Sequence, residues 1–305
     1  MLTFFSTPKP FRGHIDVIQR NAIQSWMRVR ADVELILFGN DEGAAQVARE
    51  YGIIHEPKVE RNACGTPYLN ALFDRAEEMA RHPVLCYVNC DIILMDDFRA
   101  ALATVAARSP QFLMAGRRWD MNITSPIPFE QPDWHQKLRA VTQLEGVHRP
   151  SQWIDYFAFS RGLYYRKIPR LVIGRPGFDN WLVWYARRAG ASVVNASEVV
   201  VAVHQNHDYA YHPDGEQGVW HGLEAQQNYA LLEGLRHYAT LENATHQLSY
   251  DGMKPNRRHW LVQLKRRARV EASRVWFGVL HLTRPVRHRL GLRQERPAGM
   301  PKRGQ

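Results

Sequence analysis

The residues of this 305-residue chain that most plainly could do chemistry follow an apolar run in its first third. Val84 to Asp91 reads Val-Leu-Cys-Tyr-Val-Asn-Cys-Asp, an apolar run that ends in an amide and a carboxylate. A carboxylate oxygen is a good ligand for a hard divalent cation, and such a cation stabilises negative charge on a leaving group as a Lewis acid. Asp91 is therefore our first candidate metal ligand.

A second candidate ligand stands much later in the chain. His204 ends the apolar run 193–203, and His207 and Asp208 follow it closely. Imidazole is a common metal ligand, so the pair of histidines is compatible with a metal site. The alternatives stay open at this point. A lone Asp after a strand most often ends that strand or caps a turn, and an isolated His most often has a hydrogen-bonded structural role.

The elements that must position these residues alternate regularly between strand and helix patterns. Strands are predicted at 2–5, 33–38, 53–55, 84–91 and 111–116, and helices with apolar residues at 3.6-residue spacing connect them. This alternation favours right-handed βαβ units. We therefore expect an α/β fold with a mostly parallel sheet and helices on both faces. Ligands bind such sheets at the carboxyl ends of the strands, where Asp91 and His204 would face the same crevice.

The later part of the chain is less regular. Residues 121–152 form a proline-bearing stretch with one short predicted helix, and a long insert of this kind is typically a functional loop. A strand at 154–159, a helix from about Asp179 to Arg188 and one or two strands within 193–203 are predicted after it.

The sequence Asn89-Cys90-Asp91 at the end of a buried strand resembles the Asp-x-Asp element of nucleotide-sugar-dependent glycosyltransferases of the GT-A type, the family-2-like group in particular. The resemblance covers about residues 2–208. It implies a GT-A-like, Rossmann-related catalytic domain over residues 1–215, a nucleoside diphosphate sugar as the donor, and Mn²⁺ or Mg²⁺ held by Asp91 and His204. Asn89 departs from the pattern, because a neutral amide replaces the first acid, and we expect it to contact the ribose or a metal-bound water.

Other short motifs extend the resemblance to donor binding. Ser6, Thr7 and Asp41 follow the first two predicted strands, whose loops bracket the nucleoside in this family. Asn70 matches the asparagine of an Arg-Asn pair whose arginine is absent here. Helix capping is the alternative for Asp41. We expect these four residues and Asn89 at the donor site.

The segment Gly177-Phe178-Asp179 resembles the motif that supplies the catalytic base in the same family. Inverting transfer needs a group that accepts the proton of the attacking hydroxyl, and the resemblance assigns this role to Asp179. Helix N-capping is the alternative, and a helix N-terminus would stabilise the ionised carboxylate and make it a weaker base. Asp120 and Asp155 are reserve candidates.

These features together predict a hexosyltransferase-like glycosyltransferase. It would move a sugar from a nucleoside diphosphate sugar to a hydroxyl of a glycan or lipid-linked acceptor, with inversion and with the help of a divalent metal. The alternative is a catalytically silent binding or scaffold protein of the same fold, with Asn89 as the sign of lost chemistry. The chain contains no G-x-G-x-x-G fingerprint, phosphate-binding P-loop or nucleophile elbow.

The net charge of +10 is concentrated at the C-terminal end. Residues 252–305 hold 15 Lys or Arg and two acidic residues, a charge of +13, whereas the rest of the chain carries −3. Within them, residues 256–282 combine helical apolar spacing with Trp and Arg, a pattern typical of a helix on an anionic membrane surface. Packing on the catalytic body is the equal alternative, and no nucleic acid is expected without a recognisable motif. We expect residues 216–251 to form a lid packed on the catalytic domain, and 252–305 a basic amphipathic helix with a disordered tail.

The three cysteines indicate a reducing environment. Cys64, Cys86 and Cys90 form no C-x-x-C pair, and the last two, on one strand, would be too far apart to bridge. No signal peptide or spanning segment is recognised. We therefore expect a cytoplasmic protein, peripheral on the inner membrane face if the basic segment binds lipid.

Overall fold

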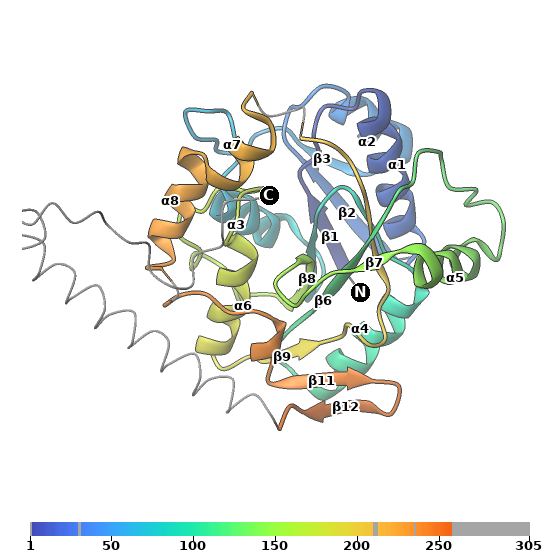
Figure 1. Ribbon diagram of the computed structural model, residues 1–305, viewed down its shortest axis with the longest axis vertical. Coiled ribbons are helices and arrows are strands. Elements are labelled where there is room, and N and C mark those ends of the chain that lie inside the picture. The colour runs from blue at the N-terminus through green and yellow to red at the C-terminus, as the bar shows by residue number, and fades with distance from the viewer. Residues whose placement is uncertain (1, 30–31, 210–212, 235, 258–305) are drawn as a thin grey trace, which may run out of the picture. The chain divides into compact units, whose positions relative to one another are not determined.

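The computed structural model describes residues 2–29, 32–209, 213–234 and 236–257. One half of its sheet consists of four parallel strands: β1 (Leu2–Ser6), β2 (Val33–Phe38), β3 (Ile54–Glu56) and β4 (Val84–Val88). They lie in the order β4-β1-β2-β3, and Figure 1 shows β1, β2 and β3 in this arrangement. This half follows the predicted βαβ pattern, although β4 ends at Val88 and not at the predicted Asp91.

The other half of the sheet contains the reversals that the alternation did not predict. β8 (Ile154–Ser160) lies between β4 and β6 (Phe112–Met121) and is antiparallel to both. β9 (Ser192–Asn195) continues parallel to β6, followed by β11 (His246–Ser249) and the antiparallel β12 (Gly252–Pro255). The sheet is therefore mixed, with more parallel than antiparallel pairings.

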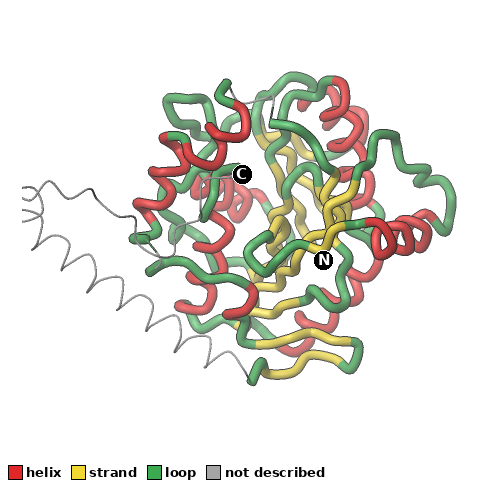
Figure 2. Tube along the Cα trace, in the orientation of Figure 1, coloured by secondary structure: helices red, strands yellow, loops and turns green. Residues whose placement is uncertain are grey.

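Helices cover both faces of the sheet, as expected (Figure 2). Residues of α3 (Leu69–Met79) and α6 (Phe178–Arg188) share one core, whereas α1 (Gly13–Met27), α2 (Ala44–Tyr51) and α4 (Asp96–Arg108) contribute to the other. The strands serve both cores because successive side chains point to opposite faces. Phe5 and Tyr87 join the first core, and Phe4 and Cys86 join the second. The α/β fold class predicted from the sequence is confirmed.

A bulge divides β6 into a first half that pairs with β9 and a second half that pairs with β10 (Ala202–Gln205). The pairing register between β6 and β8 shifts between Ala115 and Arg117. A Cβ at Gly116 would lie 2.3 Å from the Tyr156 hydroxyl, so a side chain there would clash. Beyond this bulge β6 leaves β9 and pairs with β10, which also pairs with the short β5 (Ile92–Ile93). β6 is longer than the predicted 111–116, and its second half carries Arg118 and Asp120.

The predicted insert 121–152 contains α5 (Trp134–Glu145) and β7 (Val147–His148), which pairs with β6. The predicted lid 216–251 contains most of α7 (Gly215–His221), together with α8 (Leu223–Leu231) and the 3₁₀ turn Leu241–Asn243, but β11 in the same range belongs to the main sheet.

The region predicted as a basic tail begins inside the described part of the chain. Its first residues form β12, so the sheet extends past the expected boundary at 251. Nearly all of the amphipathic helix predicted at 256–282 lies outside the described residues. Within those residues, no helix is both long and apolar enough to cross a membrane.

Candidate functional site

Asp91, His204 and His207 form a cluster at the carboxyl end of β4. One ligand atom from each of the three lies within 4.8 Å of the other two. The sheet brings them together, because His204 on β10 is paired with Ile92, the residue after Asp91. The Gln205 amide also donates a hydrogen bond of 3.1 Å to the Asp91 carbonyl. The structure thus places Asp91 and His204 close together, as expected from the strand ends, with His207 beside them.

A second carboxylate lies behind His204. This carboxylate belongs to Asp120, and its Oδ1 lies 3.2 Å from His204 Nδ1. His204 and Asp120 are paired in register on β10 and β6. Asp120 also accepts hydrogen bonds from Arg118 Nε at 2.8 Å and from Arg149 Nε at 2.5 Å. Burial opposes ionisation, but the His204 hydrogen bond and the Arg118 charge lower the pKa of Asp120. Its oxygens are engaged, so the reserve role of Asp120 as a base does not fit.

Asp91 has the properties of a metal-binding carboxylate. Burial disfavours its charge, but the contact with His207 and the proximity of His204 and Lys9 lower its pKa well below the ordinary range. Asp91 Oδ1 is buried and has no hydrogen-bond partner among the described residues. An unsatisfied buried oxygen in an ionised carboxylate calls for a partner. One carboxylate and two imidazoles are donors that a divalent cation accepts, so the residues fit such an ion.

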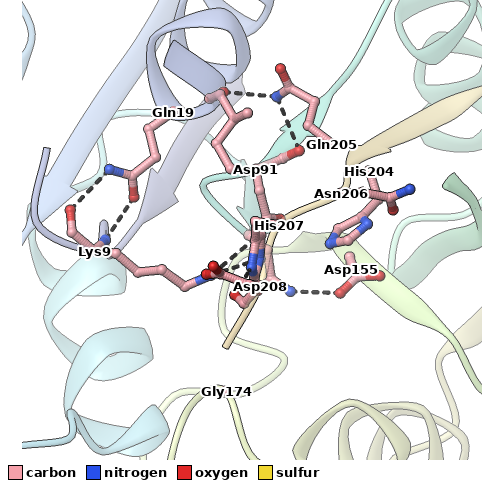
Figure 3. Close-up of polar contacts among 12 residues, drawn as sticks. Lys9, Gln19, Asp91, Asp155, Gly174, His204, Gln205, Asn206, His207 and Asp208 are labelled. Carbon is pink, nitrogen blue, oxygen red and sulfur yellow. Dashed lines mark hydrogen bonds and ion pairs between the residues drawn. The ribbon is translucent and has the colours of Figure 1, made fainter. Parts of the chain in front are cut away.

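Lys9, in the loop after β1, reaches into this cluster (Figure 3). Its Nζ lies 2.8 Å from His207 Nε2 and 3.6 Å from Asp91 Oδ2. Two hydrogen bonds with Gln19 fix the Lys9 backbone, one to its amide at 2.6 Å and one to its carbonyl at 2.9 Å. The sequence analysis missed Lys9, although it placed the neighbouring Ser6 and Thr7 at this strand end.

The donor-side residues divide into those with structural bonds and those with unused groups. The Ser6 hydroxyl donates a hydrogen bond of 2.6 Å to the Val88 carbonyl and ties β1 to β4. The Thr7 hydroxyl oxygen and Asn70 Oδ1 are buried and have no hydrogen-bond partner among the described residues. Asn89 uses both ends of its amide: Nδ2 donates to Asp155 Oδ1 at 2.6 Å, and Oδ1 accepts from Tyr87 at 2.9 Å.

Asp41 does not cap the helix that follows it. The N-cap position of α2 is Gly43, with φ +84°, and no side chain caps that helix. The Asp41 carboxylate instead pairs with Arg61 at 2.6 Å. A Cβ on Gly39 would lie 2.9 Å from Arg61 Nη2 and 3.4 Å from Thr7 Oγ1, so these side chains gather at one point beside β2. The capping alternative is therefore wrong, and the donor-binding role of Asp41 stays a prediction.

Asp179 lies in the first turn of α6 but does not cap it either. The N-cap position is Gly177, with φ +98°, and no side-chain cap is present. Burial and, to a smaller extent, the Asp155 charge raise the pKa of Asp179 to about 7, because hydrogen bonds from backbone amides only partly offset them. The prediction that the helix N-terminus would make Asp179 a weak base is therefore wrong, because desolvation outweighs the helix dipole.

Asp155, the second reserve base, connects the two parts of the site. Arg118 Nη1 donates to Asp155 Oδ2 at 3.0 Å, while Arg118 Nε donates to Asp120. Asp155 Oδ1 is engaged by Asn89. One guanidinium thus links the carboxylate behind His204 to the carboxylate that raises the pKa of Asp179. Asp155 is engaged on both oxygens and does not fit the role of a base.

Comparison with known proteins gives structural likeness only. No family model and no curated protein matches this chain. Among solved structures, S. aureus TarS 1-349 is similar at 8% identity and a TM-score of 0.41. The match covers 68% of this chain and 58% of TarS 1-349. Glucosyl-3-phosphoglycerate synthase from M. tuberculosis, in complex with Mn²⁺, uridine diphosphate and phosphoglyceric acid, is 14% identical with a TM-score of 0.42, covering 77% of this chain and 78% of its own.

The mannosyltransferase PcManGT from Pyrobaculum calidifontis, in complex with GDP-Man and Mn²⁺, is similar at 13% identity and a TM-score of 0.41, covering 67% of this chain and 56% of its own. TM-scores below 0.5 do not extend to substrates, so the function proposed next is argued from the geometry of this chain.

Proposed function

We propose that this protein is a glycosyltransferase that transfers a sugar from a nucleoside diphosphate sugar to a hydroxyl of a glycan or lipid-linked acceptor. The observation that carries the proposal is the presence of two complementary groups at one end of the sheet. One is the cluster of the ionised Asp91 with His204 and His207. The other is Asp179, a carboxyl group whose pKa is raised to about 7.

The first group supports cation binding. Asp91, His204 and His207 would hold Mn²⁺ or Mg²⁺, and the two imidazoles favour Mn²⁺ of the pair. When bound, the cation would neutralise charge on the diphosphate. Asp120 orients His204 from behind through Nδ1, which leaves Nε2 as the ligand atom. Thr7 and Asn70, with their unused buried oxygens, are the donor-side groups that we propose to contact the nucleotide.

The second group supports proton transfer. A general base works best when its pKa lies near the working pH, and Asp179 meets this condition. We propose that Asp179 takes the proton of the acceptor hydroxyl while that oxygen forms its bond to the sugar and the bond between sugar and diphosphate breaks. A single displacement of this kind inverts the configuration at the sugar carbon.

The test separates donor binding from turnover. Nucleoside diphosphates are screened by thermal shift with and without Mn²⁺, and hydrolysis or transfer is then measured with the matching sugar donor. Asp91→Ala should lose the metal-dependent stabilisation, and Asp179→Asn should keep it but lose turnover. The exposed Asp251→Asn is the matched control and should behave as the wild type. If a nucleoside diphosphate binds but no turnover is detected, and Asp179→Asn changes nothing, the result would favour a catalytically silent binding protein instead.

We also propose a cytoplasmic location with peripheral membrane contact through residues 256–282. The support is the sequence alone, because nearly all of this segment lies outside the described residues. Flotation with anionic liposomes tests the contact, with a truncation after Arg257 that spares β12 as the comparison. No flotation, or flotation unchanged by the truncation, removes the membrane claim.

A further inference from the structure

The Lys9 ammonium lies beside His207 and Asp91, at the place where a metal cation would bind to these two residues. The ammonium nitrogen is 2.8 Å from His207 Nε2 and 3.6 Å from Asp91 Oδ2, and these two atoms are themselves 3.2 Å apart (Figure 3). Lys9 thus contacts two of the three residues that form the candidate metal site. Its backbone is held on both sides by Gln19, so the loop presents the side chain from a fixed position.

The hydrogen bonds of His207 determine which of its nitrogens can accept. Nδ1 lies 2.6 Å from the Asp208 carbonyl oxygen, which can only accept, so Nδ1 carries a hydrogen. The Lys9 ammonium can only donate, so its 2.8 Å contact with Nε2 uses the Nε2 lone pair, whereas the longer contact of Nε2 with Asp91 Oδ2, at 3.2 Å, would need a hydrogen on Nε2. The contact therefore uses the single lone pair of Nε2.

The same lone pair is the one that a metal ion would need. An imidazole nitrogen offers one lone pair in the ring plane, so Nε2 can accept from Lys9 or ligate a metal, but not both. Asp91 differs, because its Oδ2 faces Lys9 and His207 while its Oδ1 is buried without a hydrogen-bond partner among the described residues. The conflict is thus confined to the His207 side of the site.

We propose that Lys9 and a divalent cation exclude each other at His207, so that Lys9 acts as an internal counter-cation which the entering metal must displace. This inference rests on the metal-binding part of the proposed function. Lys9 neutralises the buried Asp91 in the metal-free protein. Once displaced, its ammonium remains beside the site, where it can bind the negatively charged diphosphate of the donor.

The proposal reverses the usual expectation for a polar residue at a binding site. Removing Lys9 should tighten the binding of Mn²⁺ alone, because the competing hydrogen bond is lost. From the typical strength of a hydrogen bond to a charged group, converted into a change of dissociation constant, we expect the affinity for Mn²⁺ to rise about tenfold. Binding of a nucleoside diphosphate in the presence of saturating Mn²⁺ should weaken in the same variant, because the displaced ammonium is missing.

The experiment measures the Mn²⁺ dissociation constant of the full chain by calorimetry, without nucleotide, for the wild type, Lys9→Met and Lys9→Gln. Lys254→Met is the matched control, since Lys254 is exposed on β12 and pairs with Asp251. The rise in melting temperature on adding Mn²⁺ is the second measurement. It should be larger in both Lys9 variants than in the wild type, even if their metal-free forms are less stable.

The outcomes distinguish the two proposals. Tighter Mn²⁺ binding in the Lys9 variants, with Lys254→Met unchanged, supports the exclusion. Equal or weaker binding in the Lys9 variants overturns it and leaves the proposed transferase function standing. If neither the wild type nor the variants bind Mn²⁺, the exclusion and the metal site are both wrong, and the transfer assay with Asp179→Asn decides the function independently.

Discussion

His204 and Asp120 face each other across two paired strands, with His204 Nδ1 3.2 Å from Asp120 Oδ1. Arg118 and Arg149 hold the same carboxylate from its other sides. A carboxylate behind a ligating histidine fixes which ring nitrogen carries the hydrogen and how the ring is turned. The bulge at Gly116 makes this arrangement possible, because it separates the half of β6 in the main sheet from the half that carries Asp120.

Asp120→Asn should weaken Mn²⁺ binding although residue 120 is not a proposed ligand. Loss of an orienting partner behind a metal ligand typically costs about 10- to 100-fold in metal affinity. The measurement is the Mn²⁺ dissociation constant at a temperature where circular dichroism shows the variant folded, with Asp251→Asn as the exposed control. An unchanged dissociation constant would show that Asp120 does not orient His204.

Divalent metal should stabilise the wild type and not Asp91→Asn. Ligand at about 100 times its dissociation constant adds about 2.7 kcal/mol to the free energy of unfolding when only the folded state binds. The variant loses the ionised oxygen ligand, so its melting temperature should not respond to Mn²⁺. Urea unfolding with and without Mn²⁺ checks this, and chelation should return the wild type to its metal-free stability. Equal stabilisation of both proteins contradicts the assignment of Asp91.

The transfer rate should rise with pH and level off above about 7. A base must be ionised to accept a proton, and burial raises the pKa of Asp179 to about 7. The rate should therefore fall as the pH decreases through this value. Asp179→Asn should lower the rate by about 10²- to 10⁴-fold, the usual contribution of a general base. A single-turnover pH profile with the midpoint below 5 would remove Asp179 from this role.

The same group should make stability depend on pH with a defined sign. The pKa of Asp179 is higher in the folded state than in the unfolded state, so between about pH 4 and 7 the folded state binds more protons and stability falls as pH rises. Asp179→Asn removes this loss. We compare the free energy of unfolding of the variant with that of the wild type at two pH values. The difference should favour the variant more at about pH 8 than at about pH 5, by at least about 1 kcal/mol. Parallel urea unfolding curves at the two pH values measure the difference, and a pH-independent difference contradicts it.

The attachment of α8 should depend on one buried ion pair. Arg175 Nη2 lies 2.5 Å from Glu224 Oε2, and both side chains are under 10% exposed. Removing one partner of a buried pair leaves an uncompensated charge, so Glu224→Ala should destabilise the protein by about 3 kcal/mol or more. The control is Glu233→Ala, whose pair with Arg236 is exposed and should contribute less than about 1 kcal/mol. Similar losses in both variants would contradict the comparison.

The sequence by itself determined the elements and the end of the sheet where the chemistry lies. Adjacent residues such as Phe4 and Phe5 join opposite cores, and that alternation is a local property of the chain. The argument from strand ends then placed Asp91 and His204 together, although 113 positions separate them in the numbering. Helix caps were predicted less well than helix positions, because Asp41 and Asp179 have the residue type of an N-cap but a glycine takes that position in each helix.

Only the tertiary structure decided how these residues behave. The antiparallel insertion of β8, the partnership of Asp120 with His204 and the contact of Lys9 with His207 all join segments that no short window of sequence relates. The pKa of Asp179 is the clearest case, because its position at a helix N-terminus predicts a lowered value and burial produces a raised one. Desolvation depends on everything that surrounds a group in space, whereas periodicity depends only on its neighbours along the chain.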